Sequence, residues 1–139
     1  MTYLRSIVYV STASTPMSEP ELEALLVEAR GLNLETATTG VLLYSAGTFM
    51  QCFEGTEEAV AVTYERIRNS RQHYGIIELV NEPVAARSFP DWQMGFRHAR
   101  KSELLALSSA QWRRQVDAAG TMASASAGMA LLTEFWNRR

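Results

Sequence analysis

The sequence predicts an α+β fold, in which a five-stranded mixed sheet carries two helices on one face and C-terminal helices follow. Short runs rich in β-branched and aromatic residues alternate with two amphipathic helical patterns, in the order β-α-β-β-α-β-β. With 139 residues, 47% of them hydrophobic, the chain is long enough to bury a core. We divide it into a sheet domain, residues 1–98, and a helical extension, residues 99–139. In the extension, apolar residues at helical intervals follow Ser102, and Gly120 interrupts them.

The first strand and the first helix follow from short local patterns. Leu4–Val10 is rich in Ile, Val, Tyr and Leu and ends in a turn-like cluster of Ser, Thr and Pro. Ser18 and Glu21 then have the spacing of a capping box, in which each residue satisfies a free N–H group of the other. Leucines recur at helical spacing beyond them, with Glu28 expected on the opposite, polar side. Gly31 is the predicted end of this helix.

A hairpin is predicted next, because residues 40–44 and 48–53 flank a short loop that contains glycine. Alternation along the second arm places Phe49, Gln51 and Phe53 on one face. A neutral amide therefore lies between two aromatic rings on an apolar surface, where an unpaired polar group is costly. We expect Gln51 to have a hydrogen-bonding partner there.

The second helix is predicted over residues 56–67, with Glu57 and Glu58 at its positive N-terminal end. Residues 76–80 read as a fourth strand. A polar connection that contains prolines, residues 81–90, leads on to the last strand.

The last predicted strand covers Asp91–Phe96, in which Trp92, Met94 and Phe96 share one face. The complete order of elements resembles a ferredoxin-like sheet with both helices on one face, extended by one additional strand.

Composition argues against several classes of protein. Thirteen basic and 15 acidic residues give a net charge of −2, which does not favour binding to a nucleic-acid backbone or an anionic membrane. The single cysteine, Cys52, and two distant histidines indicate neither a disulfide framework nor a metal site. Neither a secretory signal nor a membrane-spanning stretch is recognisable, so a cytoplasmic location is expected.

The candidate functional residues are neutral groups that form hydrogen bonds or are polarisable. The sequence has no phosphate-binding glycine loop, nucleophile elbow, metalloprotease motif or kinase motif, so we do not expect an enzyme. Tyr9, Gln51, Trp92 and Met94 lie on predicted strands, and Asn33 precedes the hairpin. Such a set suits a neutral aromatic ligand. A purely structural role stays open, with Gln51 satisfied by a backbone group and Trp92 and Met94 filling the core.

Four segments together resemble the BLUF family of blue-light sensors using FAD. They are Ile7-Val-Tyr-Val-Ser11, Asn33 through Thr39-Gly-Val-Leu-Leu-Tyr44, Phe49-Met-Gln-Cys-Phe-Glu-Gly55 and Arg87-Ser-Phe-Pro-Asp-Trp-Gln-Met-Gly-Phe96. The resemblance extends from about Tyr3 to His98, with the segments in the family's order and spacing.

The resemblance implies an FAD whose isoalloxazine ring lies between the two helices and against the sheet. Tyr9 and Gln51 would lie near its reactive edge, Asn33 would bond its pyrimidine end, and Arg66 would contact its side. In this family, light drives an electron and a proton from the tyrosine to the flavin by way of the glutamine. The flavin returns oxidised and red-shifted, with its hydrogen bonds rearranged. Met94 is expected both at the flavin and in the relay of the signal.

Trp92 and Met94 occupy the family's signal-relay positions, and we expect Met94 to contact Gln51 in one state. The chain departs from the family's usual pattern at Leu32, where many relatives have a polar residue, and at Thr38, where isoleucine is common. These departures put one flavin contact and the recovery rate in question.

The resemblance implies a non-catalytic photoreceptor that signals to an unidentified downstream protein or through assembly as a homo-oligomer. One alternative is a ferredoxin-like module for ligand binding or assembly that lacks photoactivity. Another is a small flavin-dependent oxidoreductase, which no substrate-positioning charge cluster supports.

Overall fold

The computed structural model describes residues 4–113 and 126–138. The chain forms two compact units, Met1–Ala99 and Arg100–Arg139. In chain order the first unit contains β1 (Leu4–Ala13), α1 (Glu19–Thr36), β2 (Thr39–Ser45), β3 (Thr48–Thr56), α2 (Glu57–Arg68), β4 (His73–Val84) and β5 (Gly95–His98).

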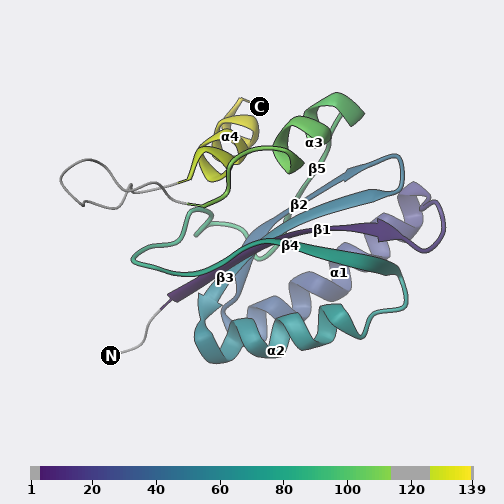
Figure 1. The fold of residues 1–139 in the computed structure, drawn as a ribbon. Coiled ribbons are helices and arrows are strands. Elements are labelled where there is room, and N and C mark those ends of the chain that lie inside the picture. Colours follow the sequence, from purple (N-terminus) through teal and green to yellow (C-terminus); the bar gives the residue numbers. More distant parts are fainter. Residues whose placement is uncertain (1–3, 114–125, 139) are drawn as a thin grey trace. The chain divides into compact units, whose positions relative to one another are not determined.

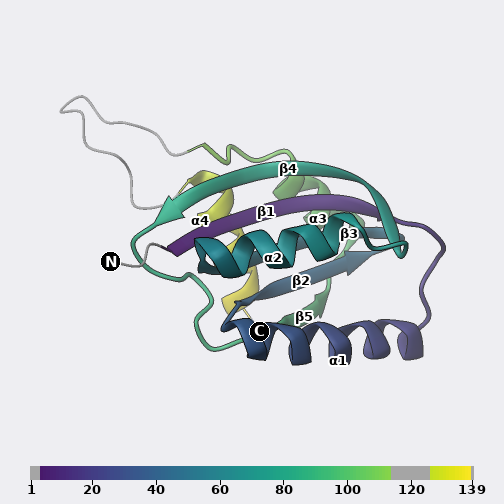
Figure 2. The ribbon, with the colours of Figure 1, turned by 90° about the horizontal axis from the view of Figure 1, so that it is seen from below.

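The strands form one five-stranded sheet in the order β4-β1-β3-β2-β5. The pairs β1–β3, β1–β4 and β2–β3 are antiparallel, whereas β5 runs parallel to β2. Both α1 and α2 lie against the same face of this sheet (Figures 1 and 2). The predicted α+β, ferredoxin-like fold is therefore confirmed.

Helix α1 begins as predicted and ends later. The Ser18 side chain accepts from the Glu21 backbone N–H, and Glu21 accepts from the Ser18 N–H, which forms the capping box. The predicted end at Gly31 is wrong, because the helix continues to its cap at Ala37, a residue in the left-handed region with φ 55°. A glycine inside a helix costs about 1 kcal/mol relative to alanine. In the following turn Asn33 is fully buried and hydrogen-bonded to Gln93 and Arg66.

Strand β4 is longer than the predicted segment 76–80 and includes the first part of the predicted connection 81–90. Its pairing with β1 shifts register between Val8 and Tyr9, and again between Val10 and Thr12. The missed stretch 81–84 pairs regularly with β1, but it contains Asn81, Glu82 and Pro83, residue types that are depleted in strands, which explains why the prediction was too short.

Strand β5 begins at Gly95, so the prediction of a strand over residues 91–96 is wrong. Trp92 and Met94 precede the strand and share no strand face with Phe96. Trp92 is 46% exposed, whereas Met94 is 2% exposed. The Trp92 carbonyl accepts from the Gly40 N–H at 2.8 Å, so this segment bonds to the start of β2 outside the β2–β5 pairing.

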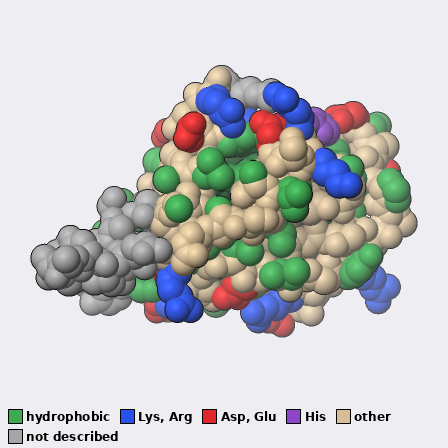
Figure 3. All heavy atoms as spheres, turned by 45° about the horizontal axis from the view of Figure 1, so that its top comes forward, with side chains coloured by type: hydrophobic (Ala, Val, Ile, Leu, Met, Phe, Trp, Pro, Cys, Tyr) green, Lys and Arg blue, Asp and Glu red, His purple; other side chains and the backbone are tan. Residues whose placement is uncertain are grey.

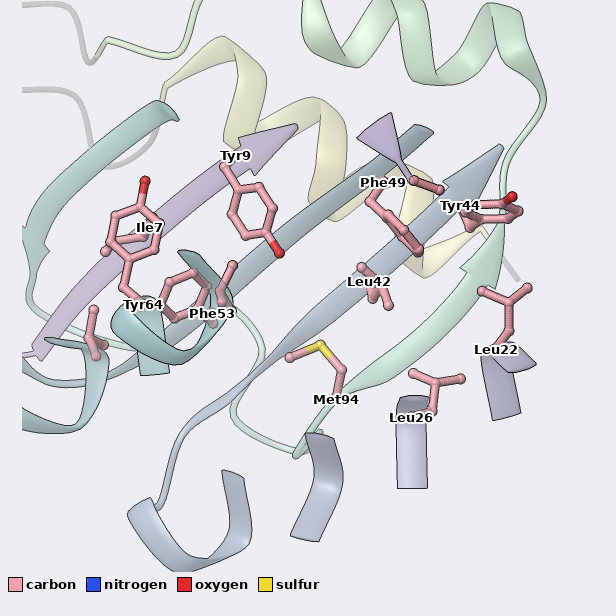
Figure 4. Packing of buried hydrophobic residues seen from close by; sticks show 13 residues of the cluster. Ile7, Tyr9, Leu22, Leu26, Leu42, Tyr44, Phe49, Phe53, Tyr64 and Met94 are labelled. Atoms are coloured by element: carbon pink, nitrogen blue, oxygen red, sulfur yellow. The ribbon is translucent and has the colours of Figure 1, made fainter. Parts of the chain in front are cut away.

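The core of the first unit lies between the sheet and its two helices (Figure 4). Phe49 and Phe53 point into it from β3, as the alternation predicts. Tyr64 of α2 packs on Phe53 with ring centroids 5.6 Å apart, and Tyr44 packs on Phe49 at 4.9 Å. These rings fill the space on either side of the position of Gln51.

The second unit contains α3 (Lys101–Ser108) and α4 (Ala127–Asn137), which confirms helices in the C-terminal part. The Trp112 ring lies so close to Gly128 that a Cβ on this glycine would be 2.4 Å from a ring carbon. Trp112 Nε1 donates to the Leu107 carbonyl at 2.9 Å. The predicted interruption at Gly120 lies outside the described residues.

Acidic and basic side chains are interspersed on the face drawn in Figure 3, and neither sign forms a continuous patch there. Among the described residues, no helix combines the length and apolar character needed to span a bilayer. Within the same residues, no group of three or more His, Cys, Asp or Glu side chains could hold a metal ion.

Candidate functional site

A cavity of about 340 Å³ lies between α1, α2 and the sheet. Its volume is within the range of roughly 300–1,000 Å³ that pockets for organic ligands have. The lining residues are Leu25, Glu28, Ala29 and Leu32 of α1, Tyr9, Leu42, Phe49, Gln51 and His73 of the sheet, Arg66 and Ile67 of α2, residues 70–72, and Met94.

Tyr9, Gln51 and Met94 form a buried chain of contacts in the wall of this cavity. Tyr9 and Gln51 face each other across the β1–β3 pair, so their side chains are neighbours on one face. The Tyr9 hydroxyl donates to Gln51 Oε1, and Gln51 Nε2 lies 3.5 Å from Met94 Sδ. The expected partner of Gln51 is therefore the Tyr9 side chain, and the expected contact between Met94 and Gln51 is present.

This arrangement gives the Gln51 amide a preferred orientation. A carbonyl oxygen accepts from the Tyr9 hydroxyl, while the NH₂ group faces a thioether that accepts weakly and cannot donate. Reversing the amide would set Oε1 against Met94 Sδ, where no donor exists. Met94 therefore favours the orientation that the structure has.

Tyr9 keeps its proton in this environment. Burial raises the pKa of the Tyr9 phenol well above its ordinary value, Tyr64 raises it further, and Arg66 opposes both. The Tyr64 ring stacks on Tyr9 with centroids 6.4 Å apart, and Phe53 meets Tyr9 edge-on at 6.3 Å. A neutral phenol thus stands at the polar edge of the cavity as a hydrogen-bond donor.

Arg66 lines the cavity and links it to Asn33. Burial lowers the pKa of the Arg66 guanidinium, and Glu28 and Tyr9 oppose that effect. Arg66 Nη2 donates to Asn33 Oδ1 at 3.2 Å, and Asn33 Nδ2 donates to the Gln93 carbonyl at 2.6 Å. Asn33 is fully buried and is not among the lining residues. Its link to the cavity is the hydrogen bond that it accepts from Arg66, which is a lining residue.

The structure separates the two expected relay residues. Met94 lines the cavity, whereas Trp92 is not a lining residue. In Figure 4 the Met94 sulfur lies within the cluster of core side chains. In this structure Met94 is thus the residue next to Gln51.

The two positions that depart from the family's pattern have different surroundings. Leu32 lines the cavity and offers it an apolar surface. Thr38 is fully buried and is not a lining residue, and its hydroxyl lies 2.7 Å from Thr36 Oγ1 and 3.4 Å from Thr63 Oγ1. Leu32 therefore changes the wall of the cavity directly, and Thr38 changes the packing behind it.

Sequence reasoning missed part of the lining. Glu28 was expected on the polar side of α1, yet it reaches the cavity, because it lies between Leu25 and Leu32 at helical spacing. His73 also lines the cavity, with Nδ1 2.7 Å from Ser11 Oγ and Nε2 2.9 Å from the Ile67 carbonyl. No signal in the sequence pairs His73 with Ser11, because the two residues are 62 positions apart.

The residues of the cavity suit a planar heteroaromatic ligand. Leu42, Phe49 and Ile67 supply apolar walls, while Tyr9 and Gln51 supply adjacent donor and acceptor groups at one edge. A flat ring system with both donors and acceptors along its rim matches this combination.

Comparisons with known proteins agree with this chemistry. The sequence model of the family described as sensors of blue light using FAD matches residues 4–95. Photoactivated adenylate cyclase subunit beta of Euglena longa is 33% identical over 92 residues, which make up 66% of this chain and 11% of that protein. The blue light- and temperature-regulated antirepressor BluF of Escherichia coli (strain K12) is 31% identical over 86 residues, 62% of this chain and 21% of that protein. The match thus spans only a small part of these relatives.

Solved structures give the same picture. The dark-state structure of BlrB, a BLUF protein, has a TM-score of 0.67 and 31% identity, with 78% of this chain and 80% of that chain covered. BlsA in its photo-activated state has a TM-score of 0.67 and 28% identity, with coverage of 78% and 79%. A bacterial light-regulated adenylyl cyclase has a TM-score of 0.66 and 32% identity, with coverage of 68% and 28%.

Proposed function

The chain belongs to the BLUF family of sensors of blue light using FAD, and from this premise we propose that Tyr9 and Gln51 are its photoactive pair. The chain is a blue-light sensor, and its cofactor is FAD. The observation that carries the proposal is the hydrogen bond from Tyr9 to Gln51 Oε1 in the wall of the cavity. We assign the flavin ring to this cavity, with Arg66, Asn33 and Met94 as further contacts.

FAD held in this cavity would supply the absorption of blue light and an acceptor for one electron and one proton. Tyr9 would donate both and regain both on recombination, because burial keeps its hydroxyl protonated and that proton already points at Gln51 Oε1. Gln51 relays the proton through its amide. Exchange of the donor and acceptor ends of this amide changes the hydrogen bonds at the cavity edge. Met94 opposes the exchange, because its sulfur has no proton to donate.

Signal output by this chain is proposed to be non-catalytic. Relatives named adenylate cyclases are far longer than the region they share with this chain, and that region is the light sensor. The Escherichia coli relative is named an antirepressor. We propose that this chain acts in the cytoplasm on a separate downstream protein or through self-association, with Met94 and Trp92 passing the change in the cavity onward.

Absorption spectra recorded before and immediately after blue light test this proposal. We expect oxidised flavin with a small red shift that reverses in darkness. Tyr9→Phe and Gln51→Leu should each retain flavin and lose the shift. Tyr44→Phe is the matched control, because it removes a phenol from the same core outside the cavity lining, and it should keep the shift.

Each alternative outcome has a definite meaning. A normal shift in Tyr9→Phe or Gln51→Leu contradicts the assigned role of that residue. A protein that takes up no FAD favours the non-photoactive assembly module. Dark oxidation of a reduced nicotinamide would favour an oxidoreductase.

A further inference from the structure

Glu54 is a fully buried carboxylate for which the proposed photochemistry has no use. It lies on β3 three residues after Gln51 and, by strand alternation, on the opposite face of the sheet. Its Oε1 accepts from the backbone N–H groups of Ser88 and Phe89 at 2.9 and 3.0 Å, and its Oε2 lies 3.1 Å from the Ser88 nitrogen. A buried carboxylate needs such donors, so this contact is a strong constraint on the backbone of residues 88–89.

A second residue ties the same stretch of chain to β3. Arg87 Nη1 donates to the Glu54 carbonyl at 3.2 Å, to the Ala37 carbonyl at 2.8 Å and to Thr39 Oγ1 at 2.9 Å. Side chain and backbone of Glu54 thus both bond to residues 87–89. Glu54 is not among the residues that line the cavity, and its carboxyl also bonds to the Ser6 side chain.

The other end of the segment carries Met94 and bonds to α1. Asn33 Nδ2 donates to the Gln93 carbonyl at 2.6 Å, and Arg30 Nε donates to the Met94 carbonyl at 2.9 Å. The segment 88–94 is therefore held at its start by Glu54, at Trp92 by the Gly40 N–H and at its end by α1. At the α1 end of the segment, Met94 Sδ lies 3.5 Å from Gln51 Nε2.

We propose that Glu54 is a positioning residue of the photoreceptor, which holds the segment 88–94 so that Met94 stays against Gln51 and thereby sets the lifetime of the light-induced state. The effect on lifetime rests on the proposed function of Gln51. Met94 favours the dark orientation of the amide, so releasing the segment removes part of the preference for returning to it. Loss of one weak hydrogen bond at Gln51 predicts recovery in darkness that is roughly three- to ten-fold slower.

Two variants of Glu54 test this placement in the purified protein kept in darkness. Glu54→Ala removes both acceptor oxygens, whereas Glu54→Gln keeps one acceptor and the side-chain volume. Amide hydrogen exchange at Ser88 and Phe89 reports the attachment itself. The NMR signals of the Gln51 side-chain amide and the Met94 methyl group report its effect in the cavity. Recovery of the absorption spectrum after blue light reports the lifetime.

Val8→Ala is the matched control. Val8 is fully buried and pairs with Cys52, so it lies on the same face of the sheet as Glu54. Its truncation destabilises the domain but leaves the Glu54 oxygens that accept from the Ser88 and Phe89 N–H groups in place. We expect faster exchange, shifted Gln51 and Met94 signals and slower recovery in Glu54→Ala, with smaller changes in Glu54→Gln. At a comparable loss of Tm, Val8→Ala should change neither the amide exchange at Ser88 and Phe89, nor the Gln51 and Met94 signals, nor the recovery in darkness.

Two results would overturn the proposal. One is faster exchange at Ser88 and Phe89 with unchanged Gln51 and Met94 signals, because Glu54 would then only stabilise a loop. The other is an equal effect of Val8→Ala, because general destabilisation would then explain the data. If Glu54→Ala does not fold, the comparison of Glu54→Gln with Val8→Ala decides between these outcomes. Failure of the proposed function looks different: the unsubstituted protein shows no light-induced shift, while the exchange and NMR measurements still test the placement of Met94.

Discussion

The hydrogen bond between Tyr9 and Gln51 predicts a measurable coupling between the two side chains. Tyr9→Phe leaves buried Gln51 Oε1 without this donor, which costs about 1–3 kcal/mol of unfolding free energy. Gln51→Leu leaves the buried Tyr9 hydroxyl without this acceptor, at a similar cost. The double variant replaces both partners with apolar groups, so its loss should be smaller than the sum of the single losses by about 1–2 kcal/mol.

Urea unfolding in darkness, with free FAD at one fixed excess, measures the four free energies of this cycle. Tyr44→Phe combined with Gln51→Leu is the control, because the Tyr44 hydroxyl accepts instead from the Met17 N–H at 3.2 Å. The losses of unfolding free energy caused by Tyr44→Phe and by Gln51→Leu should add in this control double variant. Additivity of Tyr9→Phe and Gln51→Leu within about 0.5 kcal/mol would refute the argument, because independent sites behave in that way.

Two further predictions concern the scaffold. Gly40→Ala would place a Cβ 1.9 Å from the Cys52 carbonyl oxygen in the β2–β3 pair, so it should cost about 1–3 kcal/mol or more and lower Tm, and an unchanged Tm would contradict this register. Burial raises the pKa of the Glu54 carboxyl above its ordinary value of 4.5, against the opposing N–H groups of Ser88 and Phe89 and the charge of Arg87. The folded state therefore holds this proton more tightly, and stability should fall as pH rises from about 4.5 through the raised value. Measured by urea unfolding across that pH range, the unfolding free energy of Glu54→Gln should fall less than that of the unsubstituted protein. Identical slopes of unfolding free energy against pH would argue against the raised pKa.

Local patterns were enough to predict the face of β3 on which Gln51 lies. The alternation of Phe49, Gln51 and Phe53 depends only on neighbouring residues, and it correctly predicts that the Gln51 amide faces the core. The capping box at Ser18 is equally local and is also confirmed. These features could be predicted because the side-chain periods of strands and helices are set by backbone geometry.

The segment before β5 shows where local patterns fail. Alternating Trp92, Met94 and Phe96 read as one strand face, but Trp92 bonds through its carbonyl to Gly40, and Met94 is held by Arg30. These partners are more than fifty positions distant along the chain. A two-residue alternation therefore arose here without a strand.

The sequence by itself determined the order of elements, the family and the side of β3 on which Gln51 lies, because repeating patterns and short motifs carry that information. Only the tertiary structure decided that Met94, and not Trp92, lines the cavity beside Gln51, and that Glu54 bonds to the segment leading to it. Each of these contacts joins residues at least 34 positions apart, and such pairs meet only when the whole sheet and its helices have assembled. The face of the strand on which each side chain lies is local in sequence, whereas the partners that it meets are a property of the packed fold.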